Sequence, residues 1–135
     1  ARILRFPAVA KVETFAKGPM GPEQMRHVMS LQVFNPTLLD DDIINERSAI
    51  APSQPANLFT TMMVPSLTER LHEIAAPIFG FWGTDDKFNP QSGALKLIEN
   101  ARNARMILLN QCGHWVQVEH RDLFNRSCID FLTKG

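Results

Sequence analysis

Two short polar motifs, each placed directly after an apolar run, carry the residue types of acid–base catalysis. Residues 112–115 read Cys-Gly-His-Trp and follow the apolar run at 106–109. About thirty residues upstream, Trp-Gly-Thr-Asp-Asp-Lys-Phe-Asn-Pro occupies residues 82–90 and also follows an apolar run. An acid at one strand end and a histidine at a later strand end form the second part of a triad whose chain order is serine, acid, histidine. The two motifs therefore predict general acid–base chemistry.

The acid and the base can each be assigned to one residue. Active sites of open α/β sheets lie at the carboxyl ends of the strands, and Asp86 and His114 both lie just beyond predicted strand ends. The spacing Trp-Gly-x-x-Asp-x-x-x-Pro favours Asp86 over Asp85, which we expect to be a solvated turn residue. An isolated loop histidine is more often held by backbone hydrogen bonds, but the paired aspartate loop favours a catalytic His114. The carboxylate would fix the imidazole tautomer and leave the other ring nitrogen free to take a proton.

The nucleophile of such a triad is not found in this sequence. The motif Gly-x-Ser-x-Gly does not occur in the 135 residues, and the chain does not begin with methionine. We therefore interpret the chain as the back half of an enzyme whose N-terminal half, with the serine, lies outside it. Residues 1–19 are expected to connect to that missing half.

Composition and charge exclude several classes of protein. Hydrophobic residues make up 44% of the chain and charged residues 21%, with no net charge, which argues for a folded domain and against a nucleic-acid partner. No apolar run approaches the roughly 20 residues of a membrane helix. The two cysteines are expected to be reduced thiols of a cytoplasmic protein. Since His-Glu-x-x-His and paired Cys-x-x-Cys motifs are absent, a metal is not expected.

Residues 20–65 are predicted to contain helices only. Apolar residues on one face predict a helix at about 22–34. The three aspartates at 40–42 favour the start of a second helix over a metal cluster, because acids complement the positive end of a helix. A third helix is predicted at about 54–63. Several side chains of this part are expected to give a substrate pocket an adaptable apolar lining: Met25, Met29, Phe34, Met62 and Met63.

Residues 66–135 alternate between helix and strand patterns, which predicts a parallel sheet. Short apolar runs without polar alternation suit strands that are covered on both faces. The predicted elements are a short helix with a Ser66–Glu69 capping box, a strand at 78–82, a helix capped by Asn89 with Pro90 in its first position, a strand at 105–110, and a helix at 120–132 that turns Leu123, Phe124, Cys128, Ile129 and either Phe131 or Leu132 inward. Two strands alone would leave raw edges, so the missing N-terminal part is expected to add more.

Three further polar residues have an open or a structural interpretation. Arg47 is in phase with Ile43, Ile44 and Ile50, and an arginine on an apolar face needs a partner. That partner could be a substrate carboxylate or an internal acid, and the pattern alone does not choose between them. Glu119 and His120 are expected to cap the last helix and to lie on the surface.

Taken together, these motifs resemble the C-terminal half of the α/β-hydrolase fold. Within that fold the chain resembles the meta-cleavage product hydrolases, which cleave carbon–carbon bonds in aromatic and steroid ring degradation. The resemblance covers nearly the whole chain. Its most specific parts are residues 82–90 and the run Cys-Gly-His-Trp-Val-Gln-Val-Glu at 112–119. The sequences at 124–126 and 129–132 also match.

The resemblance implies a role for each matching residue. Asp86 would be the triad acid and His114 the triad base. Arg47 would pair with the substrate carboxylate, and the helical residues 20–65 would form a lid. The remaining substrate-binding residues that the resemblance implies are Trp115, Phe88, Phe34 and Cys112. Residues 66–135 would be the C-terminal part of the hydrolase core.

The implied reaction is hydrolysis of a 2-hydroxy-6-oxo-2,4-dienoate to 2-hydroxypenta-2,4-dienoate and a carboxylic acid, without a metal or organic cofactor. The expected partner is this small dienoate, and a homo-oligomer is expected because relatives typically form one. Two other interpretations remain open. One is a general esterase or epoxide hydrolase, which has no reason to keep Arg47 at the pocket, and the other is a non-catalytic module with the same fold. The chain by itself is predicted to be inactive.

Overall fold

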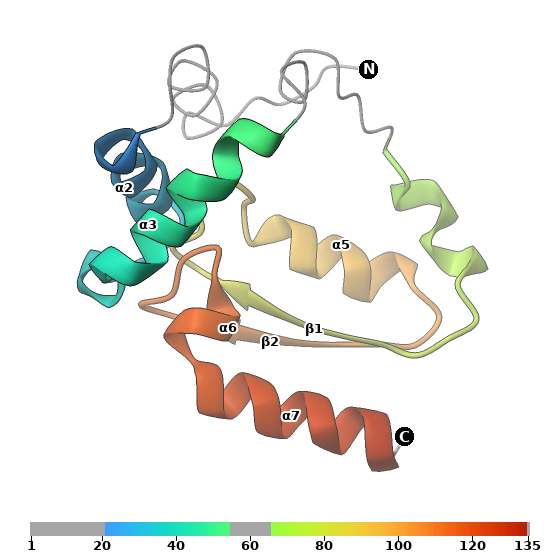
Figure 1. Cartoon of the computed structure of the whole chain (residues 1–135). Coiled ribbons are helices and arrows are strands. Elements are labelled where there is room, and N and C mark those ends of the chain that lie inside the picture. Colours follow the sequence, from blue (N-terminus) through green and yellow to red (C-terminus); the bar gives the residue numbers. More distant parts are fainter. Residues whose placement is uncertain (1–20, 55–65, 135) are drawn as a thin grey trace.

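A computed structural model describes residues 21–54 and 66–134 of the chain (Figure 1). The predicted connection at 1–19, and most of the predicted helix at 54–63 with Met62 and Met63, lie outside these residues. None of the helices in the described ranges is both long enough and apolar enough to cross a membrane.

The part of the fold that carries both motifs is a parallel pair of strands with helices on both faces. Strand β1 (Ile78–Gly83) pairs with β2 (Ala104–Leu109) over their whole length, from Ile78 opposite Ala104 to Gly83 opposite Leu109. Helix α5 (Ser92–Asn100) connects the strands on one face, and α7 (Arg121–Lys134) lies on the other (Figure 1). Both strands and their parallel pairing were predicted, and this register brings both strand ends to one edge.

Aromatic contacts join α7 to β1. The ring of Phe79 lies 5.2 Å from that of Phe131, and the ring of Phe81 lies 5.0 Å from that of Phe124, measured between centroids. Such pairs add to the stability gained from burying the rings. Phe131, and not Leu132, is therefore the residue that α7 turns toward the strand.

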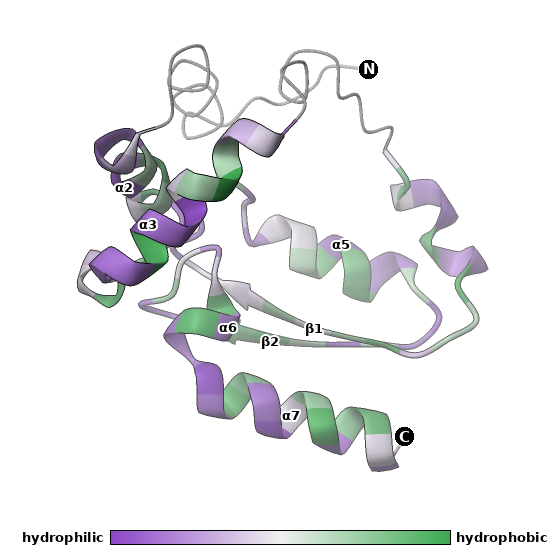
Figure 2. Cartoon of the chain, viewed as in Figure 1, coloured by the Kyte–Doolittle hydropathy of each residue, from purple (hydrophilic) through white to green (hydrophobic). Residues whose placement is uncertain are grey.

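Part of the predicted inward face of α7 is exposed. Ile129 is 60% exposed and Leu132 is 79% exposed, so the prediction that Ile129 points inward is wrong for the residues described. Figure 2 shows apolar residues along both strands and on parts of α5 and α7. Ile129 and Leu132 remain exposed because two strands form too narrow a sheet to cover the full apolar width of α7.

The helical segment, residues 21–54, has a small apolar core of its own. It contains α2 (Pro22–Ser30), the 3₁₀ turn η1 (Pro36–Leu38), α3 (Asp41–Ile50) and the 3₁₀ turn η2 (Ala51–Ser53). Five buried residues from both helices and the turn between them pack together: Met25, Met29, Val33, Leu39 and Ile44. Met25 and Met29, which were expected to line a pocket, are therefore core residues of this segment.

The start of α3 confirms that the three aspartates begin a helix. The side chain of Asp40 accepts a hydrogen bond of 2.8 Å from the N–H of Ile43, and the Asp41 side chain binds the Arg26 guanidinium. Arg26 also donates to the carbonyl of Leu39 at 2.7 Å, which ties α2 to the chain that enters α3.

The ends of other elements differ from the prediction. Helix α2 ends at Ser30, and the Ser30 hydroxyl donates to the carbonyl of His27, a bond of the kind that competes with helix continuation. Helix α5 begins at Ser92 with Gln91 as its cap. The predicted cap, Asn89, instead donates its N–H to Asp86 at 3.0 Å and accepts from the Trp82 indole at 3.1 Å.

Two further elements were not predicted correctly. The predicted capping box is wrong, because Ser66 accepts from the N–H of Thr68 at 3.5 Å and the turns that follow form the 3₁₀ helix η3 (Thr68–Glu73). A separate short helix, α6 (Val116–Glu119), precedes α7. Glu119 therefore ends a helix, whereas it was predicted to begin one.

We predict that removing the Asp40 cap destabilises α3 more than removing a neighbouring charge does. The Asp40→Ala variant should lose about 1 kcal/mol of helix stability, because the Ile43 N–H loses its acceptor. Hydrogen exchange of the Ile43 amide should then be about five times faster. Asp42→Ala is the matched control, since it removes an exposed charge from the same turn and should cost about 0.5 kcal/mol or less. Equal acceleration in the two variants would contradict the cap assignment.

Candidate active site

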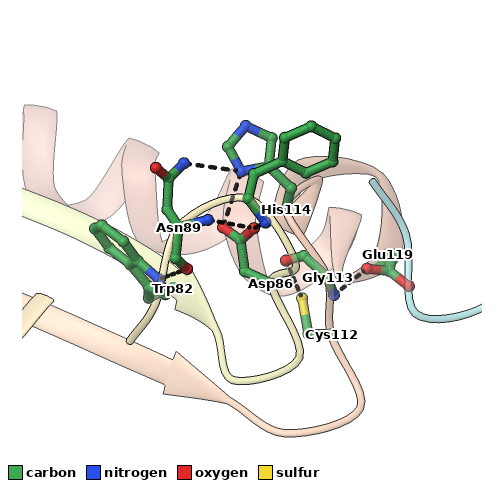
Figure 3. A network of polar contacts seen from close by, with 8 residues as sticks. Trp82, Asp86, Asn89, Cys112, Gly113, His114 and Glu119 are labelled. Atoms are coloured by element: carbon green, nitrogen blue, oxygen red, sulfur yellow. Dashed lines mark hydrogen bonds and ion pairs between the residues drawn. The ribbon is translucent and has the colours of Figure 1, made fainter. Parts of the chain in front are cut away.

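The loops after β1 and β2 bring Asp86 and His114 into direct contact. The Nδ1 atom of His114 lies 2.9 Å from Oδ2 of Asp86 (Figure 3). Because an ionised carboxylate can only accept, Nδ1 must carry the hydrogen, and Nε2 is then the nitrogen free to take a proton. The His114 side chain is 38% exposed and that of Asp86 is 6% exposed. The base is therefore accessible to a reactant, whereas the acid is almost enclosed.

The second oxygen of Asp86 is held by the backbone of its own loop. Oδ1 accepts from the N–H of Phe88 at 2.8 Å and from the N–H of Asn89 at 3.0 Å. Burial by itself would raise the pKa of Asp86, but the hydrogen bonds from His114, Asn89 and Phe88 outweigh it and lower the pKa below its ordinary value. Asp86 therefore stays ionised and cannot rotate away from the histidine.

The hydrogen bond with Asp86 raises the pKa of His114 above its ordinary value, and burial only partly opposes this effect. The stabilisation from His114 is complete below the ordinary pKa of histidine and is lost as pH rises through the raised pKa. The stabilisation from Asp86 is complete above the ordinary carboxyl pKa and is lost as pH falls through the lowered pKa. The pair therefore contributes most between these two ordinary pKa values, where both groups are charged.

The loop with His114 fits tightly against the end of β1. The N–H of Asp85 donates to the carbonyl of Cys112 at 3.0 Å, and the N–H of Thr84 donates to the carbonyl of Leu109 at 2.8 Å. A Cβ atom at Gly83 would lie 2.1 Å from the carbonyl oxygen of Gly113. This overlap is with a backbone atom, so a change of side-chain rotamer could not remove it. Glycine at position 83 therefore permits the close backbone approach that brings the two motifs together.

Arg47 contacts Trp115, the residue directly after His114. Its guanidinium carbon lies 5.7 Å from the centre of the Trp115 ring, within the range of a cation–π contact. Trp115 also packs against the apolar core of the helical segment. Arg47 is exposed. The expectation that it lies on a buried apolar face and therefore needs a partner is wrong. No salt bridge joins it to an acid in the described part of the chain.

Phe88 and Phe34 lie in different surroundings. The Phe88 ring lies 5.5 Å from the His114 ring, so it borders the Asp86–His114 pair. A cavity of about 200 Å³ is lined by residues of both motifs and of β1 and α6: Phe81, Trp82, Gly83, Asp86, Asn89, His114 and Val116. Phe34 is 43% exposed and lines a separate hollow of about 370 Å³ with Glu119 and His120. The structure does not bring Phe34 into the cavity at His114.

Cys112 is fully buried directly before the histidine loop. Burial raises the pKa of its thiol to about 12, and the negative charges of Glu119, Asp85 and Asp86 add to the shift. The thiol is therefore protonated at neutral pH and is not a nucleophile. Its sulfur contacts the carbonyl of Gly113 at 3.7 Å. Among the described residues, no group of three or more histidine, cysteine or acidic residues could hold a metal.

Two residues of the site were not identified from the sequence. Asn89 lies beside the pair, with its side-chain nitrogen 3.5 Å from Nδ1 of His114 (Figure 3). Glu119 accepts from the N–H groups of Gly113, Phe34 and Asn35. Its place at the end of the distinctive run 112–119 was the one signal in the sequence that could have identified it.

Comparisons with known proteins identify two groups of similar sequences. A 2-hydroxy-6-oxo-6-phenylhexa-2,4-dienoate hydrolase of Burkholderia cepacia is 34% identical over 121 residues, which cover 84% of this chain and 42% of that enzyme. A 2-hydroxy-6-oxononadienedioate/2-hydroxy-6-oxononatrienedioate hydrolase of Paraburkholderia xenovorans is 34% identical over 119 residues, or 82% of this chain and 41% of that protein. The chain thus spans about two fifths of the length of these curated relatives. No family model matches it.

Several solved structures have a fold similar to that of this chain. A variant of the meta-cleavage product hydrolase CumD has a TM-score of 0.79 at 23% identity, covering 100% of this chain and 53% of that one. The 2-hydroxy-6-oxo-6-phenylhexa-2,4-dienoate hydrolase of a Rhodococcus strain has a TM-score of 0.78 at 21% identity, covering 96% and 50%. An esterase from Exiguobacterium antarcticum reaches 0.71 at 12% identity, covering 91% and 47%. The likeness confirms the predicted fold, part of an α/β-hydrolase.

We predict that the raised pKa of His114 depends on Asp86. In Asp86→Asn the ring loses its anionic acceptor while burial, which lowers the pKa, remains, so the pKa should fall to or below the ordinary histidine value. The measurement is a pH titration of the His114 ring nitrogens by NMR. Asp85→Asn is the matched control, because Asp85 is exposed and bonded to the Thr84 hydroxyl. The pairing would be refuted if both variants titrated like the wild type.

Proposed function

Because the chain is a homologue of the meta-cleavage product hydrolases and has part of the α/β-hydrolase fold, we propose that it supplies the acid, the base and the carboxylate-binding arginine of a carbon–carbon bond hydrolase. The substrate is a 2-hydroxy-6-oxo-2,4-dienoate. The observation that carries the proposal is the position of Arg47 over Trp115, the residue next to the base. Because Trp115 directly follows His114, this contact supports a cation near the loop that carries the base, where an acidic substrate would need one.

In the proposed reaction, His114 moves protons and Asp86 keeps its ring oriented. Nε2 of His114 helps transfer the proton of the dienol hydroxyl to carbon, which gives a keto form that can accept electrons. Water then adds to the distal carbonyl, and the bond between C5 and C6 breaks. The products are 2-hydroxypenta-2,4-dienoate and a carboxylic acid, so one water molecule balances the reaction. The raised pKa of His114 suits a group that must hold a proton between these steps.

We propose that the nucleophilic serine and the remaining strands lie in an N-terminal part of the protein outside these 135 residues. The relatives contain additional sequence that this chain does not match. The curated relatives are more than twice as long as the matched region. The exposed side chains of Ile129 and Leu132 suit burial against additional structure. In the complete protein the helical segment would act as a lid, since it already contacts the histidine loop. The 135 residues alone would then be inactive.

A general esterase is the second candidate function, because the likeness to an esterase structure extends over 91% of the chain. An esterase would use the same acid and base but would not need Arg47. A non-catalytic module would need neither residue and would lack the serine in its complete form.

The cytoplasmic location and the homo-oligomer stay predictions.

We predict that His114→Ala reduces cleavage of the dienoate by about a hundredfold to ten-thousandfold, the usual effect of losing a general base. The measurement follows the yellow absorbance of a ring-cleavage product with the complete protein. His120→Ala is the matched control, because His120 lines the other hollow with Phe34. Unchanged bleaching in His114→Ala would rule out its role as the base.

We predict that Arg47→Ala lowers kcat/KM for acidic dienoates by about tenfold to a hundredfold, the effect of losing a hydrogen bond to a charged group. Arg47→Lys should recover only part of this loss, because lysine cannot bind a carboxylate in the bidentate manner. Arg102→Ala is the control, since Arg102 is exposed at the opposite end of the strands, just before β2. Neutral esters should be hydrolysed equally well by all three variants. A dienoate rate that does not respond to Arg47 would favour the esterase.

A further inference from the structure

One carboxylate joins the histidine loop to the helical segment. Oε2 of Glu119 accepts from the N–H of Gly113 at 2.6 Å, while Oε1 accepts from the N–H of Phe34 at 2.7 Å and from that of Asn35 at 3.0 Å. Figure 3 shows Glu119 reaching Gly113 from the side away from Asp86. We propose that Glu119 is a positioning residue for His114. It holds His114 in place by bonding the backbone of the histidine loop at Gly113 and the backbone of the helical segment at Phe34 and Asn35.

The contact through Glu119 is reinforced by direct backbone bonds. The carbonyl of Gln32 accepts from the N–H of His114 at 2.8 Å and from the N–H of Trp115 at 3.1 Å. A Cβ atom at Gly113 would lie 2.7 Å from this same carbonyl oxygen. The segment at 32–35 and the loop at 113–115 are thus bonded at close range, with Glu119 satisfying the N–H groups at either end.

The geometry explains how Glu119 acts on the histidine ring. Gly113 directly precedes His114, so the bond to Oε2 fixes the backbone from which the ring projects. On the other side of the loop, the Cys112 carbonyl accepts from Asp85, next to the acid. The ring therefore meets Asp86 only while the loop is held from both sides. A charged acceptor suits this place, because its hydrogen bonds are roughly twice as strong as neutral ones.

The test compares Glu119→Ala and Glu119→Gln in the complete protein. In Glu119→Gln one of the two oxygens becomes an NH₂ group, which cannot accept, so either Gly113 or the pair Phe34 and Asn35 loses its partner. We expect hydrogen exchange of the affected amides to be at least about tenfold faster. Glu99→Gln is the matched control, because Glu99 is an exposed glutamate on α5.

The readout that separates positioning from structural support is the NMR titration of the His114 ring. We expect its pKa to fall toward the ordinary value in Glu119→Ala, and less so in Glu119→Gln, because a displaced ring loses Asp86. Faster amide exchange with an unchanged His114 titration would overturn the proposal and leave Glu119 as structural support alone. Should Glu119→Ala fail to fold, Glu119→Gln, which keeps the side-chain volume, decides between these outcomes.

The effect on catalysis rests on the proposed function, whereas the positioning does not. If the protein cleaves dienoates, Glu119→Gln should lower kcat by about tenfold or more with little change in KM, because the base is displaced and the arginine is not. If the wild type cleaves no dienoate, the proposed function fails, and the His114 titration still tests the positioning.

Discussion

The contact between Asp86 and His114 depends on the close approach of three backbone segments at the carboxyl ends of the strands. The end of β1 meets the histidine loop at Gly83, and that loop meets the helical segment at Gly113. At both places a Cβ atom would overlap backbone atoms, which cannot move aside as a flexible side chain can. The parallel register, with Gly83 opposite Leu109, brings the first two segments to the same edge. A larger residue at either glycine would separate His114 from Asp86.

The negative charge around the site raises the pKa of two neighbouring side chains, with different consequences for each. His114 gains a proton more readily because it donates to Asp86, and the Cys112 thiol loses its proton less readily because it is buried and because the charges of Glu119, Asp85 and Asp86 add to that effect. Burial favours the neutral form of both groups, so it lowers the pKa of the imidazole and raises that of the thiol. Only in the histidine does a hydrogen bond, the one with Asp86, outweigh burial. The site is therefore built to protonate and deprotonate an imidazole and to keep the neighbouring sulfur inert.

The sequence alone was sufficient for what depends on local pattern. Both strands, the start of α3 and the approach of Asp86 to His114 follow from apolar runs, turn residues and the rule that parallel strands end at one edge. The role of Glu119 could not be predicted, because its partners Phe34 and Asn35 are 85 and 84 residues away along the chain. Asn89 had the right residue type for a helix cap, but its side chain lies against His114, with its nitrogen 3.5 Å from Nδ1, and its carbonyl accepts from the Trp82 indole.

On the proposed function, the helical segment both positions the base and binds the substrate carboxylate. The helical segment supplies the Gln32 carbonyl that fixes the backbone of His114, and it also carries Arg47 on α3. Trp115 packs against the core of this segment and meets the Arg47 guanidinium with its ring. A shift of α3 would therefore move the arginine and strain the histidine loop together. On the proposed function, the distance between the carboxylate site and the base is thus set by packing within this chain.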